Sequence, residues 1–146
     1  MYTKERIEEL VERIKDAGLY APSSFWKASV ETLQNTCNGI GADWMPKKVR
    51  KTITKACSYA ECAALIHDWQ YANNNGTKKA QESADELFRN NALDEVCYKY
   101  PQWWNPRRWF AERAVLGMYA VLVESGYQAY CIAFTEKTVK NRKKKS

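Results

Sequence analysis

Apolar residues in the first part of the chain recur at the spacing of an amphipathic helix. In residues 3–17 they stand three or four positions apart, with charged residues on the opposite side. Thr3 is a candidate N-cap for this helix, and Gly18 follows it as a stop signal. Residues 19–36, which contain a proline and several serines, instead predict irregular structure with a short extended piece.

The rest of the chain predicts further helices separated by turns and loops. Clusters of asparagine, glycine and proline interrupt the apolar periodicity at 37–43, 73–76 and 101–106. We expect helices over about 45–57, from about 60 to the turn at 73–76, over 78–97 and over 107–124. Because neither a repeat nor a linker is visible, we expect one all-α domain in residues 1–136.

The helix expected from residue 60 contains the only histidine of the chain. One of its faces holds Ala60, Ala63, Ala64, His67 and Tyr71, at spacings i, i+3, i+4, i+7 and i+11. Small residues on this face allow another element to approach closely. His67 is then either a core residue with a satisfied ring or a catalytic group. Asp68 lies about 100° further around the axis, so both side chains can reach one cleft.

Asp85 gives His67 a potential partner. It shares one stripe of the expected helix 78–97 with apolar residues, namely Phe88, Ala92 and Val96. A buried carboxylate without a donor is costly, so we expect His67 on a facing helix to donate to it. Such a bond orients the imidazole and fixes its tautomer. The alternative is an exposed aspartate near a helix N-terminus, where the helix dipole favours negative charge.

Composition places the chain among helical globular domains. It has 146 residues, of which 45% are apolar and 13% aromatic, enough to form a core. No apolar run approaches the length of about 20 residues that spans a bilayer. The charged N-terminus lacks the apolar stretch of a signal peptide, so we expect the chain to be cytoplasmic as synthesised.

The positive charge is concentrated at the C-terminus. The chain has 23 basic and 17 acidic residues, and residues 137–146 contain six of the basic ones and no acid. Residues 1–136 therefore hold 17 of each sign. We expect 137–146 to form a disordered basic tail, which either binds an anionic surface or only aids solubility. Since 1–136 show no nucleic-acid-binding motif, no specific nucleic-acid partner is expected.

Cysteine usage suggests a reducing compartment. The five cysteines cannot all pair, and their spacing does not indicate a zinc site. With one histidine, a site built from several imidazoles is excluded. We expect the cysteines to be mostly reduced core residues, with one or two bridges only if the protein is released from a cell.

A glycine-containing loop precedes the helix of His67. Gly39 and Gly41 permit backbone conformations that can turn carbonyl oxygens inward. Calcium, a hard cation, accepts carbonyl and carboxylate oxygens together, and Asp68 supplies a carboxylate. A Gly-x-Gly loop by itself is most often only a turn.

Three segments together resemble the phospholipase A2 superfamily, particularly its compact viral and phage versions. They are Cys-Asn-Gly-Ile-Gly at 37–41, His-Asp-Trp-Gln-Tyr at 67–71 and Ser-Ala-Asp-Glu-Leu-Phe at 83–88. The resemblance implies two packed antiparallel helices that carry the site, with flanking helices and a glycine-containing metal loop. Similar motifs in small phage proteins imply a phage origin and association with a virion.

The resemblance implies calcium-dependent hydrolysis of a phospholipid ester at a membrane surface. His67 would be the general base that activates water, Asp85 would hold His67, and Tyr71 would brace Asp85. The amide of Gly39 would donate to the developing oxyanion.

The same resemblance implies a set of oxygen ligands for calcium. Asp68 would bind the ion through its carboxylate, together with the backbone carbonyls of Cys37, Gly39 and Gly41. The ion would act as a Lewis acid on the ester and anchor the substrate phosphate.

Two non-enzymatic interpretations remain open. The cysteine framework of secreted animal members is not reproduced around Cys62 and Gln70, which suits an inactive phage structural or interaction module that keeps the fold. The basic tail by itself suits a nucleic-acid or anionic-surface binder.

An aromatic cluster interleaved with Arg107 and Arg108 has two interpretations. Its members are Trp103, Trp104, Trp109 and Phe110. They form either an interfacial patch that settles into lipid headgroups or ordinary core with a basic rim. We favour core.

Overall fold

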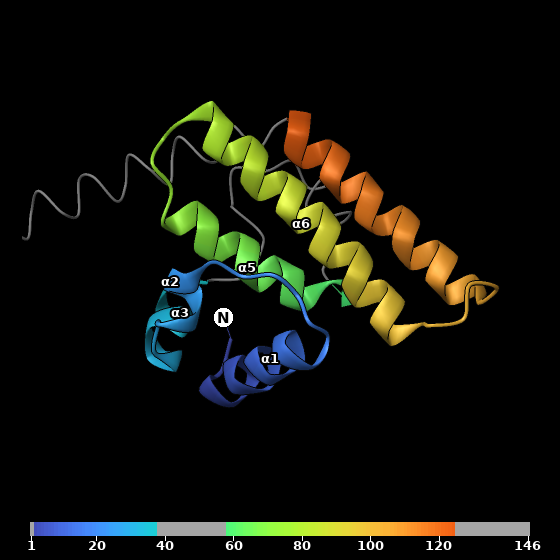
Figure 1. Ribbon diagram of the computed structural model, residues 1–146, viewed down its shortest axis with the longest axis horizontal. Coiled ribbons are helices and arrows are strands. Elements are labelled where there is room, and N and C mark those ends of the chain that lie inside the picture. The colour runs from blue at the N-terminus through green and yellow to red at the C-terminus, as the bar shows by residue number, and fades with distance from the viewer. Residues whose placement is uncertain (1, 38–57, 125–146) are drawn as a thin grey trace, which may run out of the picture.

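The structure is a computed structural model in which residues 2–37 and 58–124 are described. Their regular structure is helical, with no strand among them, which confirms the expected all-α class. Figure 1 shows the arrangement. The helices are α1 (Lys4–Asp16), α2 (Ser23–Trp26), α3 (Val30–Thr36), α5 (Glu61–Ala72), α6 (Lys78–Lys99) and a further helical stretch over 106–124.

Helix α1 has the start and stop that its sequence predicts. The Thr3 side chain accepts a hydrogen bond from the Arg6 amide at 3.2 Å and so caps the helix. Gly18 follows the last turn with a φ of 64°, in the left-handed region that favours glycine. The apolar face of the helix is buried, through Ile7, Leu10 and Ile14.

The expectation of irregular structure over 19–36 is wrong, because the chain forms α2 and α3 there. Pro22 occupies the N-cap position of α2 with a φ of −63° and a ψ of 151°, extended angles that proline adopts readily. Ser29 caps α3 by accepting from the Thr32 amide at 3.2 Å. The residues that suggested loop structure therefore mark helix starts, and burial of Phe25 and Leu33 stabilises both short helices.

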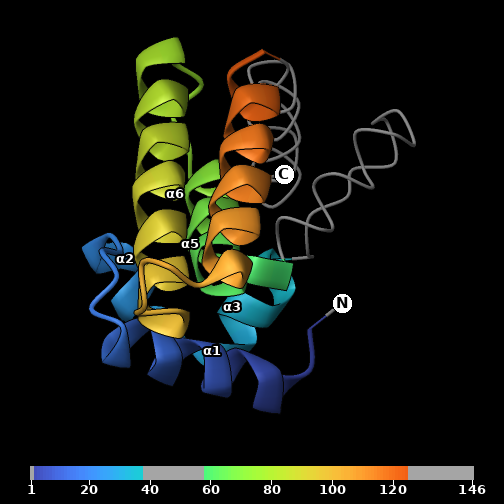
Figure 2. The ribbon, with the colours of Figure 1, turned by 90° about the vertical axis from the view of Figure 1, so that its right-hand side faces the viewer.

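Helices α5 and α6 form an antiparallel pair joined by the predicted turn (Figure 1). Gly76 adopts a φ of 77° in this turn, and Thr77 caps α6 by accepting from the Ala80 amide at 3.2 Å. The helical stretch 106–124 then runs back beside α6 (Figure 2). A core of mostly small and aliphatic residues, with one aromatic ring from Phe88, packs these three helices together; its other members include Ala63, Ala64, Ala92, Val96, Ala111, Val115 and Met118.

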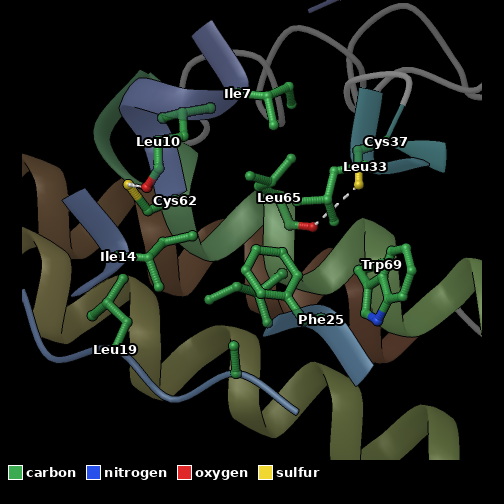
Figure 3. Packing of buried hydrophobic residues seen from close by; sticks show 12 residues of the cluster. Ile7, Leu10, Ile14, Leu19, Phe25, Leu33, Cys37, Cys62, Leu65 and Trp69 are labelled. Carbon is green, nitrogen blue, oxygen red and sulfur yellow. Dashed lines mark hydrogen bonds between the residues drawn. The ribbon is translucent and has the colours of Figure 1, made fainter. Parts of the chain in front are cut away.

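A second core lies on the other side of α5, where α1 and α3 pack against it (Figure 3). Leu65 and Trp69 of α5 meet Leu10 and Leu33 there. Since both cores meet in α5, nearly every residue from 62 to 69 is buried. A helix enclosed in this way has little polar surface, which explains why the pattern of α5 is so apolar.

The connection between α1 and α2 is tied to α6 by one side chain. The Asn91 side chain accepts from the Tyr20 backbone amide at 3.1 Å and donates to the Tyr20 carbonyl at 2.7 Å. Buried Asn91 therefore satisfies both backbone groups of a loop residue.

The favoured core interpretation of the aromatic cluster at 103–110 is wrong. Its four rings are between 59% and 79% exposed. The core face of helix 106–124 consists instead of Ala111, Val115, Met118 and Leu122, at spacings that exclude positions 109 and 110 from the same stripe. Arg113 lies over the Trp109 ring, 4.5 Å from its centroid.

Several sequence predictions can be compared with only part of the chain. Cys37, Cys62 and Cys97 are free thiols, as expected of reduced cysteines. Within the described ranges, no helix combines the length and apolar character needed to cross a bilayer. The expected helix at 45–57 and the tail at 137–146 lie outside the described residues.

Candidate functional site

The predicted bond between His67 and Asp85 is present. His67 on α5 and Asp85 on α6 face each other across the helix pair, and His67 Nε2 lies 2.9 Å from Asp85 Oδ1. Both residues are buried, with 4% and 1% of their surface exposed. The alternative of a solvent-exposed aspartate is therefore wrong. The antiparallel turn brings together two residues that are 18 positions apart in the chain.

Two further donors complete the environment of the Asp85 carboxylate. The Tyr71 hydroxyl donates to Oδ1 at 2.7 Å, from one turn after His67 on the same helix. The Gln81 side-chain amide donates to Oδ2 from one turn earlier on α6. Buried Gln81 was missed by the sequence reasoning, although its i, i+4 spacing from Asp85 is a recognisable signal. With three donors, the carboxylate is oriented and satisfied.

The bond to Asp85 determines which nitrogen of His67 can act as a base. An ionised carboxylate only accepts hydrogen bonds, so Nε2 carries the ring hydrogen and Nδ1 has a lone pair in the neutral ring. The Tyr71 and Phe88 rings lie against the imidazole, with centroids 4.1 and 5.3 Å away. Contacts from both α5 and α6 thus hold the ring in place.

The imidazole is largely enclosed, since 4% of the His67 surface is exposed. Among the described residues, Gln70 Oε1, on the same helix, is the one fully buried side-chain oxygen or nitrogen without a hydrogen-bond partner.

Asp68 lies near the start of the glycine-containing loop. The Cys37 thiol, at the end of α3, donates to the Leu65 carbonyl of α5 at 3.6 Å (Figure 3). Burial raises the pKa of this thiol, and the negative charge of Asp68 raises it further. The end of α3 and Asp68 are therefore close enough to interact electrostatically. Gly39 and Gly41 lie outside the described residues.

Cys37 and Asp68 are the two members of the expected calcium site that the structure describes. The raised pKa keeps the Cys37 sulfur protonated, so any ligand from that residue would be its carbonyl oxygen. No group of three or more histidine, cysteine, aspartate or glutamate side chains within the described ranges could hold a metal. The calcium ligands expected from the sequence are one carboxylate and several backbone carbonyls, so they would not form such a group of side chains.

A buried glutamate of α6 fixes the start of α5. Ala60 is the N-cap of α5 and has no side-chain acceptor. The Glu95 carboxylate takes its place, accepting from the amides of Cys62 at 3.3 Å and Ala63 at 3.1 Å. Arg13 of α1 lies 3.3 Å from the same carboxylate. This cap between helices places α5 along α6, and therefore His67 opposite Asp85.

Burial opposes the charge of Glu95. Removal from water raises the pKa of its carboxyl group, while the Ala63 and Cys62 amides and then Arg13 act in the opposite direction.

A hollow of about 170 Å³ adjoins Glu95, and a second of about 320 Å³ is lined by Tyr59, Tyr100, Arg107 and Phe110. Neither hollow is lined by His67 or Asp85.

No family model, curated protein or solved structure matches this chain.

Proposed function

We propose that this chain is a calcium-dependent phospholipid ester hydrolase of the phospholipase A2 type. The observation that carries the proposal is the buried contact of 2.9 Å between His67 Nε2 and Asp85 Oδ1, with the carboxylate held by Tyr71 and Gln81. We propose in addition that the α5–α6 pair corresponds to the site-bearing helix pair of that superfamily.

Each residue around the imidazole has a distinct role in this proposal. His67 takes a proton from water at Nδ1, which makes the water a nucleophile toward the ester carbonyl. Asp85 holds the ring and stabilises the positive charge that it gains. Tyr71 and Gln81 orient the carboxylate. Proton transfer by a positioned base contributes roughly 10²–10⁴-fold to a rate.

The proposed calcium site would be built from Asp68 and the loop that begins at Cys37. Asp68 and the Cys37 carbonyl would hold the ion together with the carbonyls of Gly39 and Gly41. When bound, calcium supplies Lewis-acid polarisation of the ester and a positive charge for the substrate phosphate. The oxygen donor set and the protonated Cys37 sulfur both suit this ion better than a soft metal.

Fatty-acid release from phospholipid vesicles, with calcium or with a chelator, tests the proposal. We expect release to require calcium and to fall at least about 100-fold in His67→Gln and in Asp85→Asn. Glu86→Gln is the matched control, because Glu86 neighbours Asp85 in sequence but is exposed. Release that is unchanged by the chelator, or by His67→Gln in a folded protein, excludes the mechanism.

Calcium binding can be measured separately from turnover. Titration calorimetry should detect binding to the wild type and a loss of affinity in Asp68→Asn, while His67→Gln keeps its affinity. If calcium binds but no lipid is hydrolysed, the better description is a non-catalytic module that retains the site. The exposed aromatic residues at 103–110 favour that second candidate over a nucleic-acid binder.

A further inference from the structure

The turn after α6 exposes a cluster of large aromatic rings. Trp103 and Trp104 stand in the turn between α6 and helix 106–124, and Trp109 and Phe110 near the start of that helix; the four residues are here called the aromatic tip. The chain reverses there at one end of the long axis (Figure 1). The Trp103 and Trp104 rings pack edge-on, with their centroids 5.9 Å apart. Apolar surface concentrated in this way marks an interaction site rather than scattered exposure.

Basic residues outnumber acidic ones around the aromatic tip. Between Val96 and Ala111 the chain has three basic residues and no acid: Lys99, Arg107 and Arg108. Arg108 is paired with Glu112 at 2.7 Å. Arg107 is exposed at the surface, and Arg113 lies over the Trp109 ring. The tip therefore presents aromatic rings together with guanidinium groups.

We infer that the aromatic tip is a docking surface for anionic phospholipid bilayers. Indole rings settle at the level of lipid headgroups, and arginines keep their charge at the phosphates while their stems lie along apolar surface. Charge complementarity decides the occupant, because an anionic bilayer neutralises the guanidinium groups. A second copy docked tip to tip would bring like charges together.

A hollow beside the tip provides room for a headgroup. It measures about 320 Å³ and is lined by Tyr59, Tyr100, Arg107 and Phe110. Arg107 at its wall can pair with a phosphate, while the rings contact the glycerol and acyl carbons next to it.

The tip is separate from the His-Asp site. Asp85 stands fourteen residues before the end of α6 at Lys99, which corresponds to about 21 Å of helix. Docking through the tip therefore tethers the protein without using His67 or Asp85. The inference does not depend on hydrolysis or on calcium, so it goes beyond the proposed function.

Vesicle co-sedimentation with the full chain tests the inference. The vesicles contain three parts phosphatidylcholine to one part phosphatidylglycerol, and a chelator in the buffer excludes any effect of calcium. Trp103→Ala/Trp104→Ala should weaken binding at least about tenfold. Arg107→Gln should weaken it about fivefold, and only on anionic vesicles. Matched controls are Tyr20→Ala, another exposed aromatic, and Lys79→Gln, at the opposite end of α6.

The outcomes distinguish docking through the tip from binding elsewhere on the chain and from self-association. Because all these side chains are exposed, helix content and melting temperature should not change in the variants. Unchanged vesicle binding in Trp103→Ala/Trp104→Ala overturns the inference and assigns any binding to the rest of the chain. Loss of self-association in that variant, with vesicle binding retained, also overturns it and identifies a second copy as the partner. Neither result affects the proposed function.

Discussion

Replacing Asp85 should destabilise the fold by an amount that the site geometry predicts. Asp85→Ala removes the acceptor of three donors, from His67, Tyr71 and Gln81. Tyr71 is only partly buried and can turn toward water, whereas the His67 and Gln81 groups are buried. A buried donor left without an acceptor costs about 1–3 kcal/mol. With two such donors we therefore expect a loss of about 2–6 kcal/mol, a large share of the stability of a small domain.

The isosteric substitution Asp85→Asn should lower the free energy of unfolding less than Asp85→Ala does, for a reason that can be tested independently. Asp85→Asn keeps a carbonyl oxygen for His67 and Tyr71, but it turns an amide hydrogen toward the Gln81 amide. One donor then faces another, so we expect a loss of about 1–2 kcal/mol. Gln81→Glu in the same chain restores an acceptor at that point. The double variant should therefore recover stability relative to Asp85→Asn alone.

Urea unfolding followed by far-ultraviolet circular dichroism measures these differences. Glu86→Ala is the control, since its side chain is exposed on the next residue of α6. A midpoint for Asp85→Ala that matches Glu86→Ala would refute the buried network. If the changes in unfolding free energy of Asp85→Asn and Gln81→Glu simply add in the double variant, the contact between Gln81 and Asp85 in particular would be refuted.

Three further predictions concern the cap of α5, the proposed base and the glycines. Glu95→Ala should lower the unfolding free energy by about 2–3 kcal/mol through loss of the α5 cap. Because burial raises the pKa of Glu95, the part of the stability that is linked to its protonation is present in full below the unfolded pKa and is lost as pH rises through the folded pKa. Glu95→Gln should remove this pH dependence from urea midpoints measured above about pH 4.5. Gln81→Leu should shift the acidic limb of the pH–rate profile for lipid hydrolysis without unfolding the protein, whereas an unchanged profile would mean that Gln81 does not position the base. Gly18→Ala should destabilise by about 1 kcal/mol at its positive φ, while Gly117→Ala in helix 106–124 should stabilise by about 0.5–1 kcal/mol, both read from thermal melts.

Local patterns in the sequence were sufficient to predict most of the helices. Thr3 and Gly18 bound α1 because capping and positive φ depend on neighbouring residues alone. The stripes that contain His67 and Asp85 identified the pair for the same reason, since helical spacing determines which residues share a face. The error at 19–36 arose because Pro22 and Ser29 occur both in loops and at helix starts, and burial of Phe25 and Leu33 decides between them.

Contacts between elements were decided only by the tertiary structure. The cap of α5 comes from Glu95, more than thirty residues away in sequence, and no local pattern near Ala60 indicates it. The tip aromatics are exposed because Ala111 and Val115 occupy the core face of their helix. Composition favours burial of tryptophan, but the direction in which a helix face points depends on the helices packed against it.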